Sequence, residues 1–184
     1  AVFITTLFLK TLPPDHLRSG MAEVLKSMLL GNALLWRKLS SRPFKDLIAD
    51  PAENAFSDKL VRAAVTYKNK VVERDFNERH QRKALNFGHT IGHALESYAL
   101  ESLEKPLLHG EAIAAGMICA TFLSHLKTGL PEKEFNAITN YIVSGFGVVS
   151  IPETAKSRLM ELVMFDKKMI GGQLKFTLIA APGR

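Results

Sequence analysis

Apolar residues recur every three or four positions along most of this chain, which is the spacing of one face of an α-helix. Leu17, Met21 and Val24 begin the first such pattern. Asp15 follows two prolines and can cap its start, whereas the Ser-Arg-Pro run at 41–43 breaks helical geometry. The pattern predicts a helix from about residue 15 to residue 36.

The same spacing predicts further helices, and a different spacing predicts one strand. The helical patterns cover residues 57–73, 85–100, 109–127, 132–144 and 154–165. The polar residues 75–83 are expected to form a connector. After a Gly-Gly turn, Leu174, Phe176 and Leu178 alternate with polar residues, which favours a short strand. The predicted fold class is therefore mainly α, a multi-helix domain spanning 1–184 with a short β element.

The composition is typical of a soluble globular domain, with 47% hydrophobic and 23% charged residues. Its one cysteine, Cys119, excludes an internal disulfide and is expected to be a core thiol. No apolar run reaches the ~18–20 residues that span a bilayer, and no signal peptide is visible. We therefore expect a cytoplasmic protein with no membrane partner. The net charge of +6 is scattered and not interleaved with aromatic residues, so nucleic acid is not an expected partner.

Three of the six histidines fall within a short stretch of the chain. His89 and His93 are four residues apart and share a helix face, and His109 opens the next predicted helix. Glu23 lies in an apolar run, where a carboxylate needs a partner. Histidines and a carboxylate in this pattern predict a divalent-metal site.

Glycines flank these histidines, and they allow two interpretations. Gly88 and Gly92 would each cost about 1 kcal/mol inside a helix. A helix tolerates glycine where another group approaches its backbone closely. The approaching group is either part of a functional site or a second helix, and the two interpretations are compatible.

Two common types of site are excluded by single positions. A helical zinc-protease motif needs Glu directly after its first histidine, where this chain has Thr90. A dinucleotide-binding loop needs three glycines, but after Gly145 and Gly147 the third place is Ser150. The chain is therefore not expected to bind NAD in the usual way.

Charged and amide side chains accompany the histidine motif and would form an anion pocket if they met around a metal. Taken singly, each is most often part of a solvated surface. The candidates are Lys68; the series Glu78, Arg82 and Asn86, spaced by four; and the pair Lys167 and Lys168. Lys26, three residues after the candidate ligand Glu23, is its neighbour on one helix face, a spacing typical of a surface ion pair.

Four of these segments resemble the motif series of the 3-dehydroquinate synthase family. They are residues 20–26, 85–93, 109–117 and 166–168. Their order matches that of the family, and so do their spacings, apart from a slightly long loop before His109. The resemblance covers essentially the whole chain.

The resemblance implies a function and a missing part. Members of the family convert 3-deoxy-D-arabino-heptulosonate 7-phosphate into 3-dehydroquinate and phosphate, a phosphorus–oxygen lyase reaction of the shikimate pathway. They use NAD and Zn²⁺ or Co²⁺, and their NAD is bound mainly by an N-terminal α/β domain of the same polypeptide. No such domain is expected within this sequence, so the chain is predicted to be a C-terminal domain that is inactive alone. A homodimer is an open alternative.

The resemblance also implies a role for each candidate residue. Glu23, His89 and His109 would hold the metal, and His93 beside it would form hydrogen bonds or transfer protons. The remaining roles are as follows: Lys26 on a substrate hydroxyl, Lys68 and Arg82 on the carboxylate, Asn86 and one of Lys167 or Lys168 on the phosphate, and Glu78 orienting the basic cluster. Of these residues, His93, Lys26, Lys68 and Glu78 are the expected catalytic group.

Three alternatives stay open. Other sugar phosphate cyclases share the metal triad but differ in their carboxylate-binding residues. Metal-dependent alcohol dehydrogenases have a similar fold with different motifs. A helical interaction module without chemistry would show no metal binding.

Overall fold

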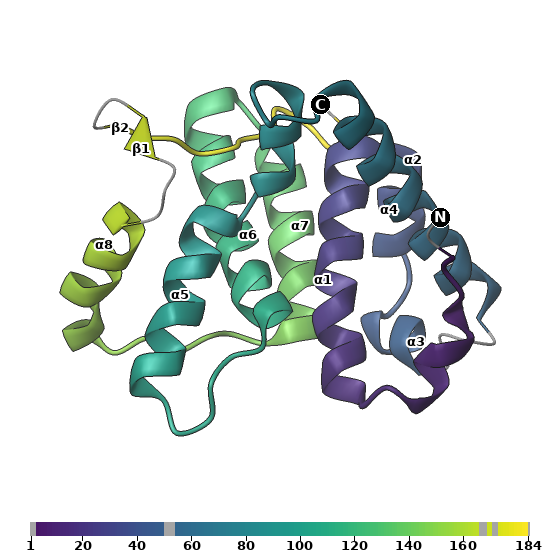
Figure 1. The fold of residues 1–184 in the computed structure, drawn as a ribbon, viewed down its shortest axis with the longest axis horizontal. Coiled ribbons are helices and arrows are strands. Elements are labelled where there is room, and N and C mark those ends of the chain that lie inside the picture. The colour runs from purple at the N-terminus through teal and green to yellow at the C-terminus, as the bar shows by residue number, and fades with distance from the viewer. Residues whose placement is uncertain (1–2, 50–53, 166–168, 171–172, 184) are drawn as a thin grey trace.

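A computed structural model describes residues 3–49, 54–165, 169–170 and 173–183 of the chain (Figure 1). These residues form a mainly α structure with very little sheet, as the sequence predicts. The helices are η1 Thr6–Thr11, α1 Pro14–Gly31, α2 Ala33–Ser40, α3 Phe44–Ile48, α4 Ala55–Arg74, η2 Gln81–Asn86, α5 His89–Ser102, α6 His109–Thr128, α7 Glu132–Phe146, η3 Glu153–Ala155 and α8 Lys156–Phe165. Among the described helices, none combines the length and hydropathy of a membrane span.

Helix α1 runs through the middle of the molecule, and most of the core forms around it (Figure 1). Its residues Leu25, Met28 and Leu29 are completely buried. On the side of α2 and α7, the Trp36 ring packs edge-on against Tyr141, with centroids 5.7 Å apart. The apolar face that the sequence predicts for this helix is therefore the one that anchors it.

The single helix predicted for residues 15–36 is wrong, because the chain breaks at Asn32. The Asn32 backbone is not helical, and its side-chain oxygen accepts a hydrogen bond from the Leu35 N–H, which caps α2. The short helix α3 also has no counterpart among the sequence predictions.

Helix α5 begins at His89, not at residue 85 as predicted. Gly88 adopts a left-handed conformation with φ of 79°, which ends the preceding η2 segment and directs the chain into α5. His89 therefore occupies the first position of its helix, and Gly88 lies outside it.

Among the described residues, the β content is one antiparallel pair of two-residue strands, β1 Met169–Ile170 and β2 Gln173–Leu174. The strand predicted for 173–178 is confirmed for its first two residues and is wrong after Leu174. The following segment crosses the helices instead, where Thr177 donates to the Lys83 carbonyl and the Ile179 N–H donates to Ser124 Oγ.

Candidate metal centre

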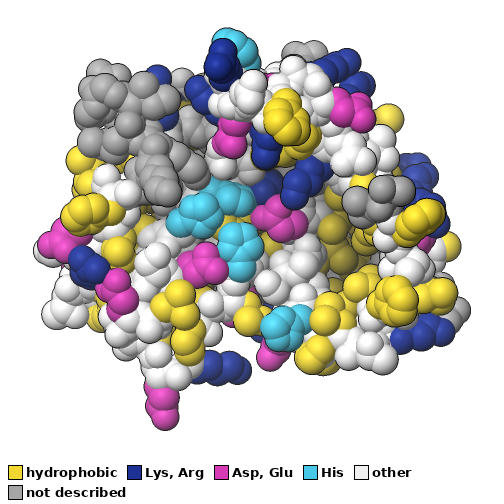
Figure 2. All heavy atoms as spheres, in the orientation of Figure 1, with side chains coloured by type: hydrophobic (Ala, Val, Ile, Leu, Met, Phe, Trp, Pro, Cys, Tyr) yellow, Lys and Arg dark blue, Asp and Glu magenta, His cyan; other side chains and the backbone are white. Residues whose placement is uncertain are grey.

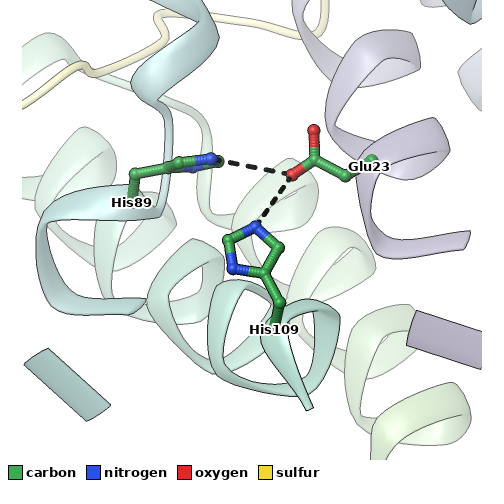
Figure 3. A group of neighbouring side chains, drawn as sticks. All are labelled: Glu23, His89 and His109. Carbon is green, nitrogen blue, oxygen red and sulfur yellow. Dashed lines mark ion pairs between the residues drawn. The ribbon is translucent and has the colours of Figure 1, made fainter. Parts of the chain in front are cut away.

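Three candidate ligands from three helices meet at one point (Figure 3). Glu23 comes from α1, His89 is the first residue of α5, and His109 is the first residue of α6. Glu23 Oε1 lies 3.7 Å from His89 Nε2 and 3.9 Å from His109 Nε2. Packing of the three helices thus brings Glu23 close to histidines that are far from it in the sequence.

Contact between α1 and the start of α6 brings His109 to Glu23. Gly110 donates its N–H to Ser19 Oγ at 2.9 Å, one turn before Glu23 on α1. A Cβ on Gly110 would lie 1.9 Å from the Ser19 carbonyl oxygen, so only glycine allows this approach. Arg18 and Glu111 form an ion pair of 2.6 Å beside it.

A second close contact joins α5 to α6. A Cβ on Gly116 would lie 2.0 Å from the Gly88 carbonyl oxygen and 2.7 Å from the Gly92 nitrogen. The glycines around His89 therefore serve helix packing. That packing also places His89 opposite His109.

Each histidine turns one ring nitrogen toward Glu23 and the other toward a hydrogen-bond acceptor. His89 Nδ1 lies 3.2 Å from the Phe87 carbonyl oxygen, and His109 Nδ1 lies 3.1 Å from Glu96 Oε2. This pattern directs both Nε2 atoms toward Glu23, as in many histidine–metal sites, and His89 Nε2 also lies 3.4 Å from Lys26 Nζ.

The three donor atoms fit a divalent metal in kind and in spacing. Two nitrogens and one carboxylate oxygen are a common catalytic zinc set. Ligands about 2.0–2.1 Å from tetrahedral zinc lie about 3.3–3.4 Å apart. The donors of Glu23, His89 and His109 all lie within 4.8 Å of one another, so small side-chain rotations would reach that spacing.

The surroundings of Glu23 and His89 favour the protonation states in which these side chains bind a metal. The buried Lys26 Nζ lies 3.0 and 2.8 Å from the two Glu23 carboxylate oxygens. Burial raises the pKa of Glu23, but the charge and hydrogen bond of Lys26, together with the charges of His89 and His109, outweigh it, so the net pKa is lowered. Burial, aided by the Lys26 charge, lowers the pKa of His89 to about 4. An anionic carboxylate and a neutral imidazole are the forms that bind metals.

His93 belongs to a second, overlapping group. Its ring centroid lies 5.1 Å from that of His89 and 6.0 Å from that of His109. The donor atoms of His93, Glu96 and His109 also lie within 4.8 Å of one another. Distance alone therefore allows two ligand sets, both of which contain His109.

A cleft of about 180 Å³ opens beside Glu23 and His89. On this face, histidine, acidic and basic side chains gather near the centre of the molecule (Figure 2). The cleft is lined by Glu23, Lys26, Ser27, Lys68, Glu78, Arg82, Leu85, Asn86 and His89. It therefore collects most of the polar residues that the sequence singles out, while Lys167 and Lys168 lie outside the described residues.

The outer wall of the cleft is ordered by carboxylates. Glu78, in a left-handed conformation with φ of 54°, accepts a hydrogen bond of 2.7 Å from Asn86 Nδ2. Arg82 Nε lies 4.0 Å from Glu78, and its Nη1 donates to the Phe76 carbonyl. Asp75 accepts backbone hydrogen bonds from residues 79, 80 and 82, which lower its pKa. The predicted connector is thus an organised part of the site.

Sequence reasoning missed several residues that hold the site together. Ser19, Arg18 and Glu111 join α1 to α6, and Glu96 contacts His109. Glu111 and Glu96 had a detectable signal, since Glu111 occupies a helix-capping position and Glu96 follows His89 by two turns.

Cys119, expected in the core, is exposed.

Comparison with known proteins places this arrangement in one family. The family described as 3-dehydroquinate synthase C-terminal matches residues 20–169. A 3-dehydroquinate synthase from Parabacteroides distasonis is 37% identical over 182 residues, which cover 99% of this chain and 50% of the relative. One from Geobacillus kaustophilus is 36% identical over 186 residues, covering 100% of this chain and 48% of the relative. The chain thus spans about half the length of these curated relatives.

Two solved structures share the fold. ValA, a 2-epi-5-epi-valiolone synthase from Streptomyces hygroscopicus with NAD⁺ and Zn²⁺ bound, has a TM-score of 0.81 and 26% identity, with 96% of this chain and 48% of that chain covered. A 2-deoxy-scyllo-inosose synthase with carbaglucose-6-phosphate, NAD⁺ and Co²⁺ has a TM-score of 0.68 and 25% identity, with 95% and 46% covered. Because the family model matches residues 20–169, which is most of the sequence, the chain belongs to the 3-dehydroquinate synthase family.

Proposed function

We propose that this chain is the metal- and substrate-binding half of an enzyme that converts 3-deoxy-D-arabino-heptulosonate 7-phosphate to 3-dehydroquinate and phosphate. The observation that carries the proposal is the meeting of Glu23, His89 and His109 at the edge of a basic cleft. Relatives named 3-dehydroquinate synthase support the choice of reaction, since they match almost the whole chain at 33–37% identity.

Glu23, His89 and His109 would hold Zn²⁺ or Co²⁺ through one oxygen and two nitrogens. The bound ion would lower the pKa of a substrate hydroxyl and polarise the ketone formed from it. Lys26 lies within hydrogen-bonding distance of Glu23 and would also donate to a substrate hydroxyl. This set directs the hydroxyl-bearing part of the substrate toward α1.

The cleft wall would bind the anionic groups of the substrate. Lys68 and Arg82 would bind the carboxylate, and Asn86 with Lys167 or Lys168 would bind the phosphate. Glu78 would hold Asn86 and Arg82 in place, because its carboxylate lies 2.7 Å from the Asn86 amide nitrogen. Charge-assisted hydrogen bonds from Arg and Lys are the strong contacts for such groups.

The reaction also needs a proton acceptor and a nucleotide. Loss of phosphate by β-elimination breaks a carbon–oxygen bond and removes a proton from the neighbouring carbon. His93, beside both metal-binding histidines, would accept or donate protons there. NAD would take up a hydride and return it within each turnover, and it would be bound mainly by the N-terminal domain of the longer polypeptide.

Three measurements on the chain and on a longer, two-domain version test the proposal. The chain should take up one zinc ion, and His109→Ala should not. Calorimetry of the chain with NAD should show no heat of binding, and phosphate release should occur only with the two-domain protein. Equal zinc content in the unmodified chain and in His109→Ala would contradict the ligand assignment. Turnover by the 184-residue chain would contradict the need for a second domain.

A substrate panel separates this reaction from those of related cyclases. The two-domain protein should release phosphate from the heptulosonate phosphate and not from hexose or sedoheptulose phosphates that lack its carboxylate. Lys68 and Arg82 give the physical reason, since two cations in one cleft favour a substrate with an additional anion. Turnover of a substrate without a carboxylate would point to another sugar phosphate cyclase.

A further inference from the structure

We propose that Glu96 is the positioning residue that aims His109 at the metal. This inference rests on the proposed function, because it concerns the same site. Glu96 follows His89 by seven residues on α5, so it lies two turns further along the same face of that helix. From there its Oε2 reaches His109 Nδ1, across the gap to α6, at 3.1 Å.

His109 needs such a partner more than the other histidine does. The His109 side chain is 45% exposed, whereas that of His89 is 13% exposed and is held by the surrounding atoms. An exposed imidazole at a helix start can rotate, and rotation would carry its Nε2 away from Glu23. Residues from a different helix must therefore fix the ring.

A carboxylate on Nδ1 fixes both the ring and the tautomer. The Nδ1–H donates to Glu96, so the lone pair remains on Nε2, the nitrogen that lies 3.9 Å from Glu23. The negative charge also makes the imidazole a stronger ligand. Partners of this kind typically change metal affinity by about 10–100-fold when removed.

A different role for Glu96 is conceivable from distances alone. Glu96 belongs to the second group of possible ligands, with His93 and His109. In the structure, however, its carboxylate oxygen is paired with the His109 Nδ1, whereas the Nε2 atoms of His89 and His109 converge on Glu23 (Figure 3). The orientation of the rings thus favours Glu23 as the metal ligand and Glu96 as the residue that orients His109.

Cobalt titration of the purified chain tests the role of Glu96, because cobalt(II) reports its ligands through visible absorption. Glu96→Ala should weaken cobalt binding by about 10–100-fold and keep the wild-type spectrum once saturated. Glu96→Gln retains an acceptor oxygen for Nδ1–H and should recover much of that loss. Glu101→Ala removes a carboxylate from the same helix, where it pairs with Arg158, and should leave cobalt affinity unchanged.

The outcomes separate this inference from the proposed function. Wild-type affinity in Glu96→Ala would overturn the role of Glu96 while leaving the metal site intact. Loss of the cobalt spectrum in both Glu96 variants, as complete as in His89→Ala, would overturn it in favour of direct ligation. Absence of any cobalt spectrum in the unmodified chain would overturn both proposals.

Discussion

The metal-ligand cluster and the outer wall of the cleft lie side by side but are built in different ways. The ligands sit on α1, α5 and α6, whose backbones touch at Gly110 and Gly116 with no room for a side chain. The wall consists of residues 75–86 and includes η2, in which no residue is buried. It is held by the carboxylates of Asp75 and Glu78. Backbone packing fixes one region, and hydrogen bonds fix the other.

This difference indicates which region can change without loss of the fold. A close-packed helix contact resists any added atom. A hydrogen-bonded surface segment tolerates substitution, and substitutions there mainly affect the binding of a ligand that contacts it. Two synthases with different products share this fold with the chain, at TM-scores of 0.81 and 0.68. The contrast leads to four predictions.

The largest effect is expected within the ligand cluster, in the two-domain enzyme that we propose. His89→Ala should abolish metal binding and turnover together, because it removes a ligand. His93→Ala should keep the metal and lower the rate by about 10²–10⁴, the usual contribution of a positioned proton-transfer group. Metal content and turnover of both variants decide the matter, and loss of metal from His93→Ala would show that the ligand set is wrong.

Arg82→Ala should affect the wall alone. Loss of a charge-assisted contact worth about 1.5–3 kcal/mol corresponds to a roughly 10–150-fold higher KM. Zinc content and the free energy of unfolding should stay close to those of the unmodified protein. Arg79→Ala, a neighbouring exposed cation, is the matched control and should leave KM unchanged. A drop in zinc content with Arg82→Ala would mean that the two regions are not separable.

Gly116→Ala should lower the free energy of unfolding by about 1–3 kcal/mol, because its Cβ would press on the Gly88 carbonyl oxygen. Gly20→Ala is the control, since a Cβ there meets nothing within 4 Å and alanine favours the helix. It should leave stability unchanged or raise it by up to about 1 kcal/mol. Chemical denaturation measures both, and equal effects would contradict the close-contact argument.

The smallest effect is expected from acid at the wall. Backbone hydrogen bonds lower the pKa of Asp75 below its usual 3.8. A lowered carboxyl pKa stabilises the folded segment above the usual value, and this contribution disappears as the pH falls through the lowered one. The protection factors of the amides of residues 79, 80 and 82, which correct for the intrinsic pH dependence of exchange, should therefore fall only below about pH 4. Asp75→Asn should remove this pH step, and a step that persists would assign it to another group.

The sequence predicted regular helices better than it predicted their ends. Helix α6 was expected at 109–127 and spans His109–Thr128, because its apolar pattern and terminal Gly129 agree. The break at Asn32 and the start of α5 depend on one cap and one left-handed glycine, and periodicity averages over such single positions. The contact partners of the site, such as Ser19 and Glu96, depend on tertiary approach, which spacing along the chain does not contain.

Because the three candidate ligands come from three separate helices, a metal bound there would act as a cross-link between distant parts of the chain. An ion that binds only the folded state stabilises it by mass action, by about 2.7 kcal/mol at 100 times its dissociation constant. Metal supply would then set how often α1 separates from α5 and α6. The supply of metal would thereby also set how long the folded chain resists proteases.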